Sequence, residues 1–171
     1  MRSLAQELKA GVASVYHHVP DKATLLAEAT DAILATVPAP SAGDWAARIA
    51  ETADGFRRVL LEHPGIAPYV RRHLRELPAG AHATRSIVDV LEEAGCERSD
   101  ARRLTDVVGI YVVGSVGDDG VTPSDLRRGR PSHTTAGAAP LDEATFQVGL
   151  QLLIDGIRAH LQRTRLQERE H

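Results

Sequence analysis

Residues 12–22 combine the side-chain types that a protein needs to bind DNA. Groove recognition requires short side chains that can approach base edges, and the sequence has three in a row at Val12, Ala13 and Ser14. The hydrogen-bond donors that follow them, and that could reach phosphates or bases, are Tyr16, His17, His18 and Lys22. The whole chain is slightly acidic, with a formal charge of −3, so DNA binding would have to come from these local side chains.

Two short helices with a tight break between them would position these residues. Leu4 and Leu8 lie four residues apart, as on one face of a helix. Gly11 supplies the turn before a second helical segment over residues 12–18, and Asp21 is a suitable N-cap for a third helix. This pattern fits a helix-turn-helix, whose second helix lies in the major groove. It also fits two short core helices that expose a polar face to solvent.

No arrangement of residues indicates catalysis or metal binding. The eight histidines lack the spacing to a second histidine and a carboxylate that a metal motif requires, and no P-loop, dinucleotide-binding loop or GxSxG motif occurs. His17 and His18 are adjacent and would point about 100° apart on a helix. Cys96 is the single cysteine, which excludes an intrachain disulfide, and its place after Gly95 favours an inert thiol. We therefore expect no enzyme activity, no cofactor and no metal site.

The composition is that of an ordinary globular protein. Hydrophobic residues make up 43% and charged residues 25% of the 171 residues, which suits one domain with a small appended module. No stretch is apolar enough to span a membrane, and the N-terminus lacks the apolar core of a secretory signal. The sequence therefore predicts a cytoplasmic protein.

The chain divides into two parts, and every segment with a regular pattern is helical. Residues 38–43 are rich in Pro and Ala and predict a linker between a module of residues 1–37 and a domain of residues 44–171. Residues 114–140 contain five Gly, three Pro and no periodicity, which predicts a mobile loop. The fold class is therefore all-α.

Capping residues predict where the helices of the second part begin and end. Asp44 predicts the start of a long amphipathic helix that ends at His63-Pro64-Gly65, and Gly95 predicts the end of another. Ser99 predicts the N-cap of the next helix. Residues 107–116 have strand propensity, but the helical start before them favours a helix.

The last helix, which we expect to begin at Asp142, carries two apolar stripes. One stripe includes Phe146, and the flatter second stripe consists of Gly149, Leu152 and Gly156. A helix with two such stripes requires two partners, and glycines seven residues apart would let a second backbone approach. The alternative is a helix that packs entirely within its own core. We expect the charged end, residues 163–171, to fray.

At the N-terminus the sequence resembles the DNA-binding region of TetR-family transcriptional repressors. The resemblance rests on motif residues at matching spacing, namely Leu4-Ala5, Leu8, Tyr16, His18, Lys22 and Leu25. More loosely, the remainder resembles the tetracycline-repressor-like C-terminal domain, with His63-Pro64-Gly65 after a long helix and a similar segment over residues 146–157. Together the resemblance covers roughly residues 2–163.

The resemblance implies three sets of functional residues. The DNA contacts would be Arg2, Val12, Ala13, Ser14, Tyr16, His17, His18 and Lys22. An effector pocket between apolar helices would involve Phe56, Leu60, Tyr69, Ile87, Leu91 and Tyr111, with polar contacts available from Arg71, His63, His73 and His82. The interface of a homodimer, built from the last two long helices, would include Val108, Val112, Gly149, Leu152, Leu153 and Gly156. For each of the six pocket residues ordinary core packing is the alternative, and for the four polar residues the alternative is a solvated side chain.

The sequence departs from the family pattern near its start. Lys9 stands where Gly is usual in the turn, and Gly11 stands where Ser or Thr usually caps the second helix. The helix that precedes Ser3 in the family is missing, which predicts an N-terminally truncated helix-turn-helix, either natural or because Met1 is an internal methionine.

Three functional hypotheses follow, in this order. The first is a homodimeric repressor that reads a palindromic operator and is released by a small-molecule effector, with residues 38–43 as the hinge. The second is a truncated relative that cannot bind DNA and acts as a small-molecule-binding dimer. The third is an all-α enzyme, for which the sequence offers no catalytic residues.

Overall fold

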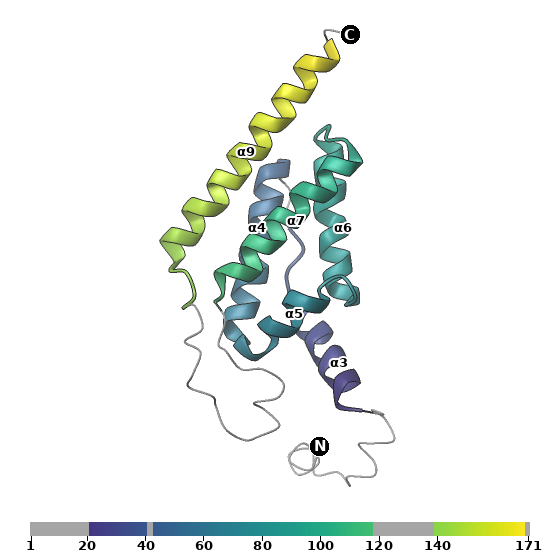
Figure 1. The fold of residues 1–171 in the computed structure, drawn as a ribbon, viewed down its shortest axis with the longest axis vertical. Coiled ribbons are helices and arrows are strands. Elements are labelled where there is room, and N and C mark those ends of the chain that lie inside the picture. The colour runs from purple at the N-terminus through teal and green to yellow at the C-terminus, as the bar shows by residue number, and fades with distance from the viewer. Residues whose placement is uncertain (1–20, 41–42, 118–138, 170–171) are drawn as a thin grey trace.

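The computed structural model describes residues 21–40, 43–117 and 139–169, and every regular element within these ranges is helical (Figure 1). The helices are α3 (Lys22–Leu34), α4 (Trp45–Glu62), α5 (Ala67–His73), α6 (Pro78–Glu93), α7 (Arg98–Ser115) and α9 (Glu143–Arg169), with a 3₁₀ turn η1 (Pro64–Ile66) between α4 and α5. The predicted all-α class is confirmed. The two helices predicted within residues 1–20 lie outside the described residues.

Aspartates cap three of the helices, Asp21 and Asp44 as the predicted N-caps and Asp142 at the expected start of the last helix. Asp21, Asp44 and Asp142 each accept a hydrogen bond from the backbone amide three residues later, at 2.8 Å in all three cases. Such a cap satisfies one of the amides that have no partner within the helix. Gly95, with φ of +89°, ends α6 as predicted, because a left-handed conformation there strains any residue with a Cβ.

The boundaries of α7 and α9 differ from the predicted ones. Ser99 is not the N-cap of α7, because the helix already begins at Arg98 and the Ser99 hydroxyl bonds the Glu97 carboxylate. α7 also continues through Ser115, beyond the predicted loop start at residue 114, and buries the Ser115 hydroxyl against the Val112 carbonyl at 2.7 Å. At the C-terminus, α9 does not fray after residue 163 but stays helical through Arg169.

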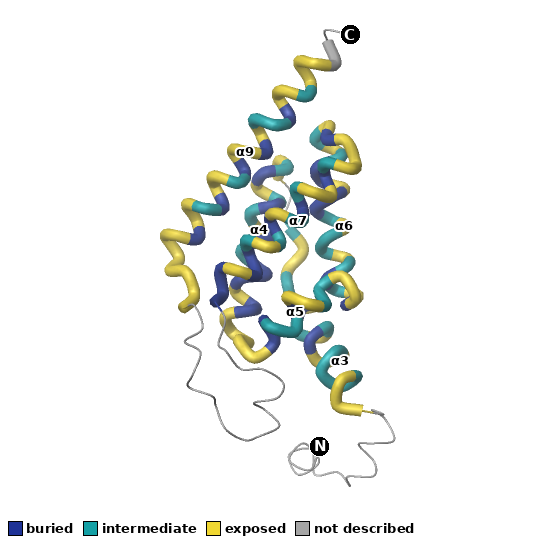
Figure 2. The backbone as a smooth tube through the Cα atoms, viewed as in Figure 1, coloured by how far each residue is buried: buried dark blue, intermediate teal, exposed yellow. Residues whose placement is uncertain are grey.

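α4, α6 and α7 pack against one another and form the centre of the molecule (Figures 1 and 2). α9 runs along one side of this centre and contacts α7, while α3 lies at one end, against α6 and α4. The core is built from side chains with almost no exposed surface, among them Ile49, Leu60, Leu91, Val108 and Phe146. No helix in the described part of the chain is both long and apolar enough to cross a membrane.

Candidate functional site

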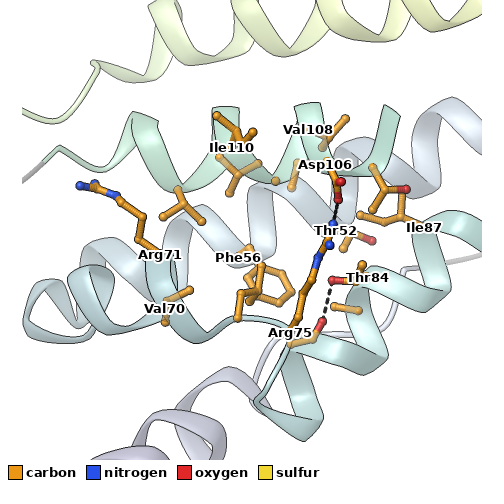
Figure 3. A pocket seen from close by; sticks show the side chains of 18 of the residues that line it. Thr52, Phe56, Val70, Arg71, Arg75, Thr84, Ile87, Asp106, Val108 and Ile110 are labelled. Atoms are coloured by element: carbon orange, nitrogen blue, oxygen red, sulfur yellow. Dashed lines mark hydrogen bonds and ion pairs between the residues drawn. The ribbon is translucent and has the colours of Figure 1, made fainter. Parts of the chain in front are cut away.

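A cavity of about 570 Å³ lies between α4, α5, α6 and α7 (Figure 3). A volume of this size is typical of small-molecule sites. Its walls are mostly apolar, with Phe56 from α4, Val70 from α5, Ile87 from α6 and both Val108 and Val112 from α7. These five side chains are buried, whereas Ile110 of α7, which also lines the cavity, is 74% exposed, so the cavity extends from the core to the surface.

Three threonines supply polar groups on the apolar walls. Thr52, Thr84 and Thr105 line the cavity from three different helices. Each hydroxyl donates to the carbonyl four residues earlier in its own helix, at 2.7–2.9 Å. Because the donor hydrogen is used in this way, these hydroxyls can offer acceptor lone pairs to a molecule in the cavity.

Charged side chains gather on one side of the cavity, at α5 and the turn that follows it. Arg71 donates to the carbonyl of Gly117 at 3.0 Å. Arg75 extends toward α7 and forms an ion pair with Asp106 (Figure 3). Arg72 and Glu76 also line the cavity, so the lining carries three guanidinium groups and two carboxylates. The signal available from the sequence was the concentration of three arginines within residues 71–75.

Of the six residues predicted for the effector pocket, Phe56 and Ile87 line the cavity. The other four do not line it. Leu60 and Leu91 are fully buried in the core, because neighbouring helices cover them on all sides. Tyr69 stacks on His73 at a ring distance of 4.5 Å, outside the cavity lining. Among the predicted polar contacts, Arg71 lines the cavity and His63, His73 and His82 do not.

The sixth residue, Tyr111, belongs to a cluster that fastens α9 to the centre of the molecule. Its ring stacks on Phe146 at 5.4 Å, and its hydroxyl donates to the Phe146 carbonyl at 2.8 Å. Burial raises the pKa of Tyr111, which the nearby Arg57 charge partly opposes, so the hydroxyl stays a donor. Arg57 is buried over the Phe146 ring, 4.4 Å from its centroid, and donates to the Leu141 carbonyl and the Glu143 carboxylate at 2.6 and 2.5 Å.

The residues predicted for the dimer interface lie on two different sides of their helices. Val108 and Val112 are buried within the chain, and Gly149 faces Tyr111, so these three offer no surface to a partner. Leu152 is 68% exposed, Leu153 is half-buried, and a Cβ added to Gly156 would meet nothing. The helical period explains the correction, because residues three or four apart share a face and 108 and 112 face inward.

The outward side of α7 and α9 carries further apolar residues that sequence reasoning missed. Val107 on α7 is 48% exposed and Val148 on α9 is 62% exposed. Ile110 on α7 is 74% exposed but belongs to the cavity lining (Figure 3). We call the outward positions Val107, Val148 and Leu152 the α7–α9 face. The signal available from the sequence was the spacing of Val148 and Leu152, four residues apart on one side of α9.

The predicted DNA contacts other than Lys22 (Arg2, Val12, Ala13, Ser14, Tyr16, His17 and His18) lie outside the described residues. Lys22 is exposed at the first position of α3. A hydrogen bond connects α3 to α6, one of the helices that form the cavity. The Asp31 carboxylate accepts it at 2.7 Å from the backbone amide of Ala79, in the first turn of α6.

The described residues offer no cluster of three or more His, Cys, Asp or Glu side chains that could hold a metal ion. The Cys96 thiol is buried. Burial raises its pKa, and the charges of Asp100, Glu97 and Glu92 raise it further. A thiol in this state is protonated at neutral pH and is not a nucleophile.

Comparison with known proteins places these features in a family. Residues 37–143, which include α4 to α7 and the whole cavity, match the family model described as the tetracyclin repressor-like C-terminal domain. A curated HTH-type transcriptional regulator from Saccharopolyspora erythraea is 32% identical over 178 residues, which cover 93% of this chain and 75% of that protein.

Solved structures of similar fold include complexes with DNA and with a small molecule. BioQ with its natural double-stranded DNA operator matches with a TM-score of 0.67 at 25% identity, over 93% of this chain and 85% of BioQ. The TetR family protein ActR of Streptomyces coelicolor, in complex with (S)-DNPA, matches with a TM-score of 0.66 at 26% identity, over 94% of this chain and 87% of ActR.

Proposed function

The chain belongs to the TetR family of transcriptional regulators, and from that membership we propose that it is a homodimeric repressor whose operator binding is released by a small molecule. The observation that carries the proposal is the cavity of about 570 Å³ inside the matched domain. BioQ forms a complex with its DNA operator and ActR forms a complex with (S)-DNPA. These complexes support the proposal that this chain binds both an operator and a small molecule.

In this proposal the effector occupies the cavity between α4, α5, α6 and α7. Apolar walls with a few polar groups are what a small-molecule site requires, because the walls supply binding energy and the polar groups fix orientation. Phe56 and Ile87 would contact the apolar body of the effector. Such a molecule shifts the regulator between two states only by as much as its affinity for them differs.

The contact between α3 and α6 would carry the effect of the effector to the DNA-binding residues. α6 forms one wall of the cavity, and its first turn is bonded to Asp31 of α3. Three residues separate α3, which begins at Lys22, from residues 12–18, the proposed recognition segment. A movement of α6 would therefore change the position of α3 and of the segment before it.

Operator binding is the direct test of the proposal. The 171-residue chain would be titrated onto DNA that flanks its own gene, with excess unrelated DNA as competitor, at two salt concentrations. We expect specific binding that Tyr16→Ala abolishes. Lys22→Ala should weaken binding to all sequences and reduce the salt dependence, because Lys22 would contact a phosphate.

The matched control is Arg85→Ala, which removes an exposed cation from α6, away from the proposed DNA contacts. This variant should bind the operator like the unmodified chain. If the unmodified chain binds no DNA specifically, the repressor proposal is wrong for this polypeptide. A chain that binds small molecules without binding DNA would then be the better account.

A further inference from the structure

We propose that the cavity selects amphipathic anions, molecules with an apolar body and one carboxylate, sulfonate or phosphate group, and that Arg75 binds the anionic group. The inference rests on the proposed effector function and adds the chemical class of the effector. It is carried by the distribution of charge around the cavity and by the pairing of Arg75 with Asp106 (Figure 3).

The charges of the cavity lining favour an anion. Three arginines and two carboxylates line it, and all three arginines lie within one short stretch, residues 71–75. Asp106 is already paired with Arg75, and the Glu76 carboxylate bonds His73 at 2.7 Å. A cationic group would therefore meet carboxylates that are occupied and arginines that repel it.

Arg75 is the arginine best placed to change partners. Its side chain is 64% exposed and that of Asp106 is 43% exposed, so solvent weakens their ion pair. The guanidinium group can bind an oxyanion through two parallel hydrogen bonds, which makes a ligand anion a competitive partner. Arg75 follows α5 and Asp106 lies on α7, so their ion pair connects two sides of the cavity. An anion that enters between these sides would meet the Arg75 guanidinium group.

The remaining lining fits the apolar body of such a molecule. Phe56, Val70 and Ile87 contribute apolar lining from three different helices. The threonine hydroxyls can accept hydrogen bonds but have used their own donors on backbone carbonyls. Arg75 would therefore supply the charge recognition and the apolar walls most of the contact area.

Two fluorescent dyes with the same skeleton test the inference without knowledge of the natural effector. 8-Anilinonaphthalene-1-sulfonate carries a sulfonate, and N-phenyl-1-naphthylamine is the same aromatic body without it. Both would be titrated against the full chain, with affinity and stoichiometry taken from the increase in fluorescence. We expect one site per chain and at least tenfold tighter binding of the sulfonate dye.

Three variants then assign the selectivity to Arg75. Arg75→Gln should weaken the sulfonate dye about tenfold and leave the neutral dye unchanged, and Arg75→Lys should recover part of the loss. Asp106→Asn should strengthen the sulfonate dye several-fold, because the competing carboxylate is gone. The matched control, Arg85→Gln, removes an exposed arginine of α6 that does not line the cavity and should change neither dye.

The outcomes separate this inference from the proposed function. Equal affinity for the two dyes, or equal losses for both in Arg75→Gln, would overturn the anion selectivity while leaving an effector pocket in place. A weaker sulfonate dye in Asp106→Asn would also overturn it. If neither dye binds a chain whose circular dichroism is that of a folded helical protein, both the inference and the effector pocket are wrong.

Discussion

At the scale of single residues, the contact between Tyr111 and Gly149 decides how closely α7 and α9 approach. A Cβ built on Gly149 would lie 2.1 Å from the Tyr111 hydroxyl oxygen, far inside van der Waals contact. The tyrosine cannot easily move away, because its ring stacks on Phe146 and its hydroxyl bonds the Phe146 carbonyl. Position 149 therefore requires glycine because the Tyr111 side chain occupies the space that a Cβ would need.

Gly149→Ala should destabilise the protein for this reason. The alanine methyl group would displace the Tyr111 hydroxyl and disturb its hydrogen bond and ring contact. We expect a loss of about 1–3 kcal/mol in the free energy of unfolding, measured by chemical denaturation. The gain in helix propensity, about 1 kcal/mol or less, opposes this loss and does not outweigh it.

The control for this variant is Gly114→Ala in α7, where an added Cβ meets no atom within 4 Å. It should be neutral or stabilise the chain by up to about 1 kcal/mol. Equal stability of the Gly149 and Gly114 variants would show that the space around Tyr111 adapts without cost.

At the scale of helices, α3 is held to the rest of the molecule by packing on α6 and α4 and by one polar contact. Asp31 accepts from the Ala79 amide at 2.7 Å and thereby serves as the N-terminal cap that α6 lacks from its own sequence. Leu34, buried at the end of α3, supplies apolar contact close to it. This arrangement makes the position of α3 depend on the first turn of α6.

Asp31→Ala should weaken the contact between α3 and α6. The α6 amide would lose its acceptor, with a cost of about 1 kcal/mol to overall stability, as for the loss of a helix cap. We expect faster amide hydrogen exchange in residues 22–34 and in the first turn of α6, measured by mass spectrometry, with α9 unchanged. Asp31→Asn should keep most of the protection, because an asparagine oxygen can accept the same hydrogen bond.

Asp89→Ala is the control for the charge itself, since it removes an exposed aspartate from the middle of α6. Exchange in α3 should be the same in this variant as in the unmodified chain. If Asp31→Ala also leaves hydrogen exchange in α3 unchanged, apolar packing alone holds α3 in place. The Asp31 hydrogen bond would then not transmit movement of α6 to the DNA-binding residues.

At the scale of the whole molecule, the α7–α9 face is the surface that a second copy would cover. Val107, Val148 and Leu152 expose large apolar side chains on two neighbouring helices. Exposed apolar surface of this kind is typical of protein interfaces. An operator with two half-sites requires two recognition segments at a fixed distance, which a dimer through this face would provide.

The double variant Val148→Glu and Leu152→Glu should therefore be monomeric. Both side chains are exposed and neither lines the cavity, so the charges should affect association and leave the fold and dye binding intact. Light scattering coupled to size-exclusion chromatography measures the molecular mass of the variant in solution. If the variant is monomeric, its affinity for the operator should fall at least tenfold. His82→Glu, an exposed substitution on α6, should leave the mass unchanged, and a double variant that remains dimeric would exclude the α7–α9 face as the interface.

The sequence by itself determined the fold class and the main helix starts. The caps Asp21, Asp44 and Asp142 and the left-handed Gly95 act over three or four residues, so their effect can be read from neighbouring positions in the chain. The resemblance of short motifs also identified the family that the comparisons then showed. Ser99 misled the prediction because its hydroxyl had a competing local partner in Glu97.

Only the tertiary structure decided which apolar residues line the cavity and which fill the core or face outward. Phe56 and Leu60 lie on one helix with similar side chains, yet only Phe56 reaches the cavity. Likewise, Gly149 and Gly156 share a stripe in the sequence, but Gly149 meets Tyr111 and Gly156 is open. The physical reason is that periodicity fixes the direction of a side chain relative to its own helix, whereas burial depends on neighbouring helices that are distant in the sequence.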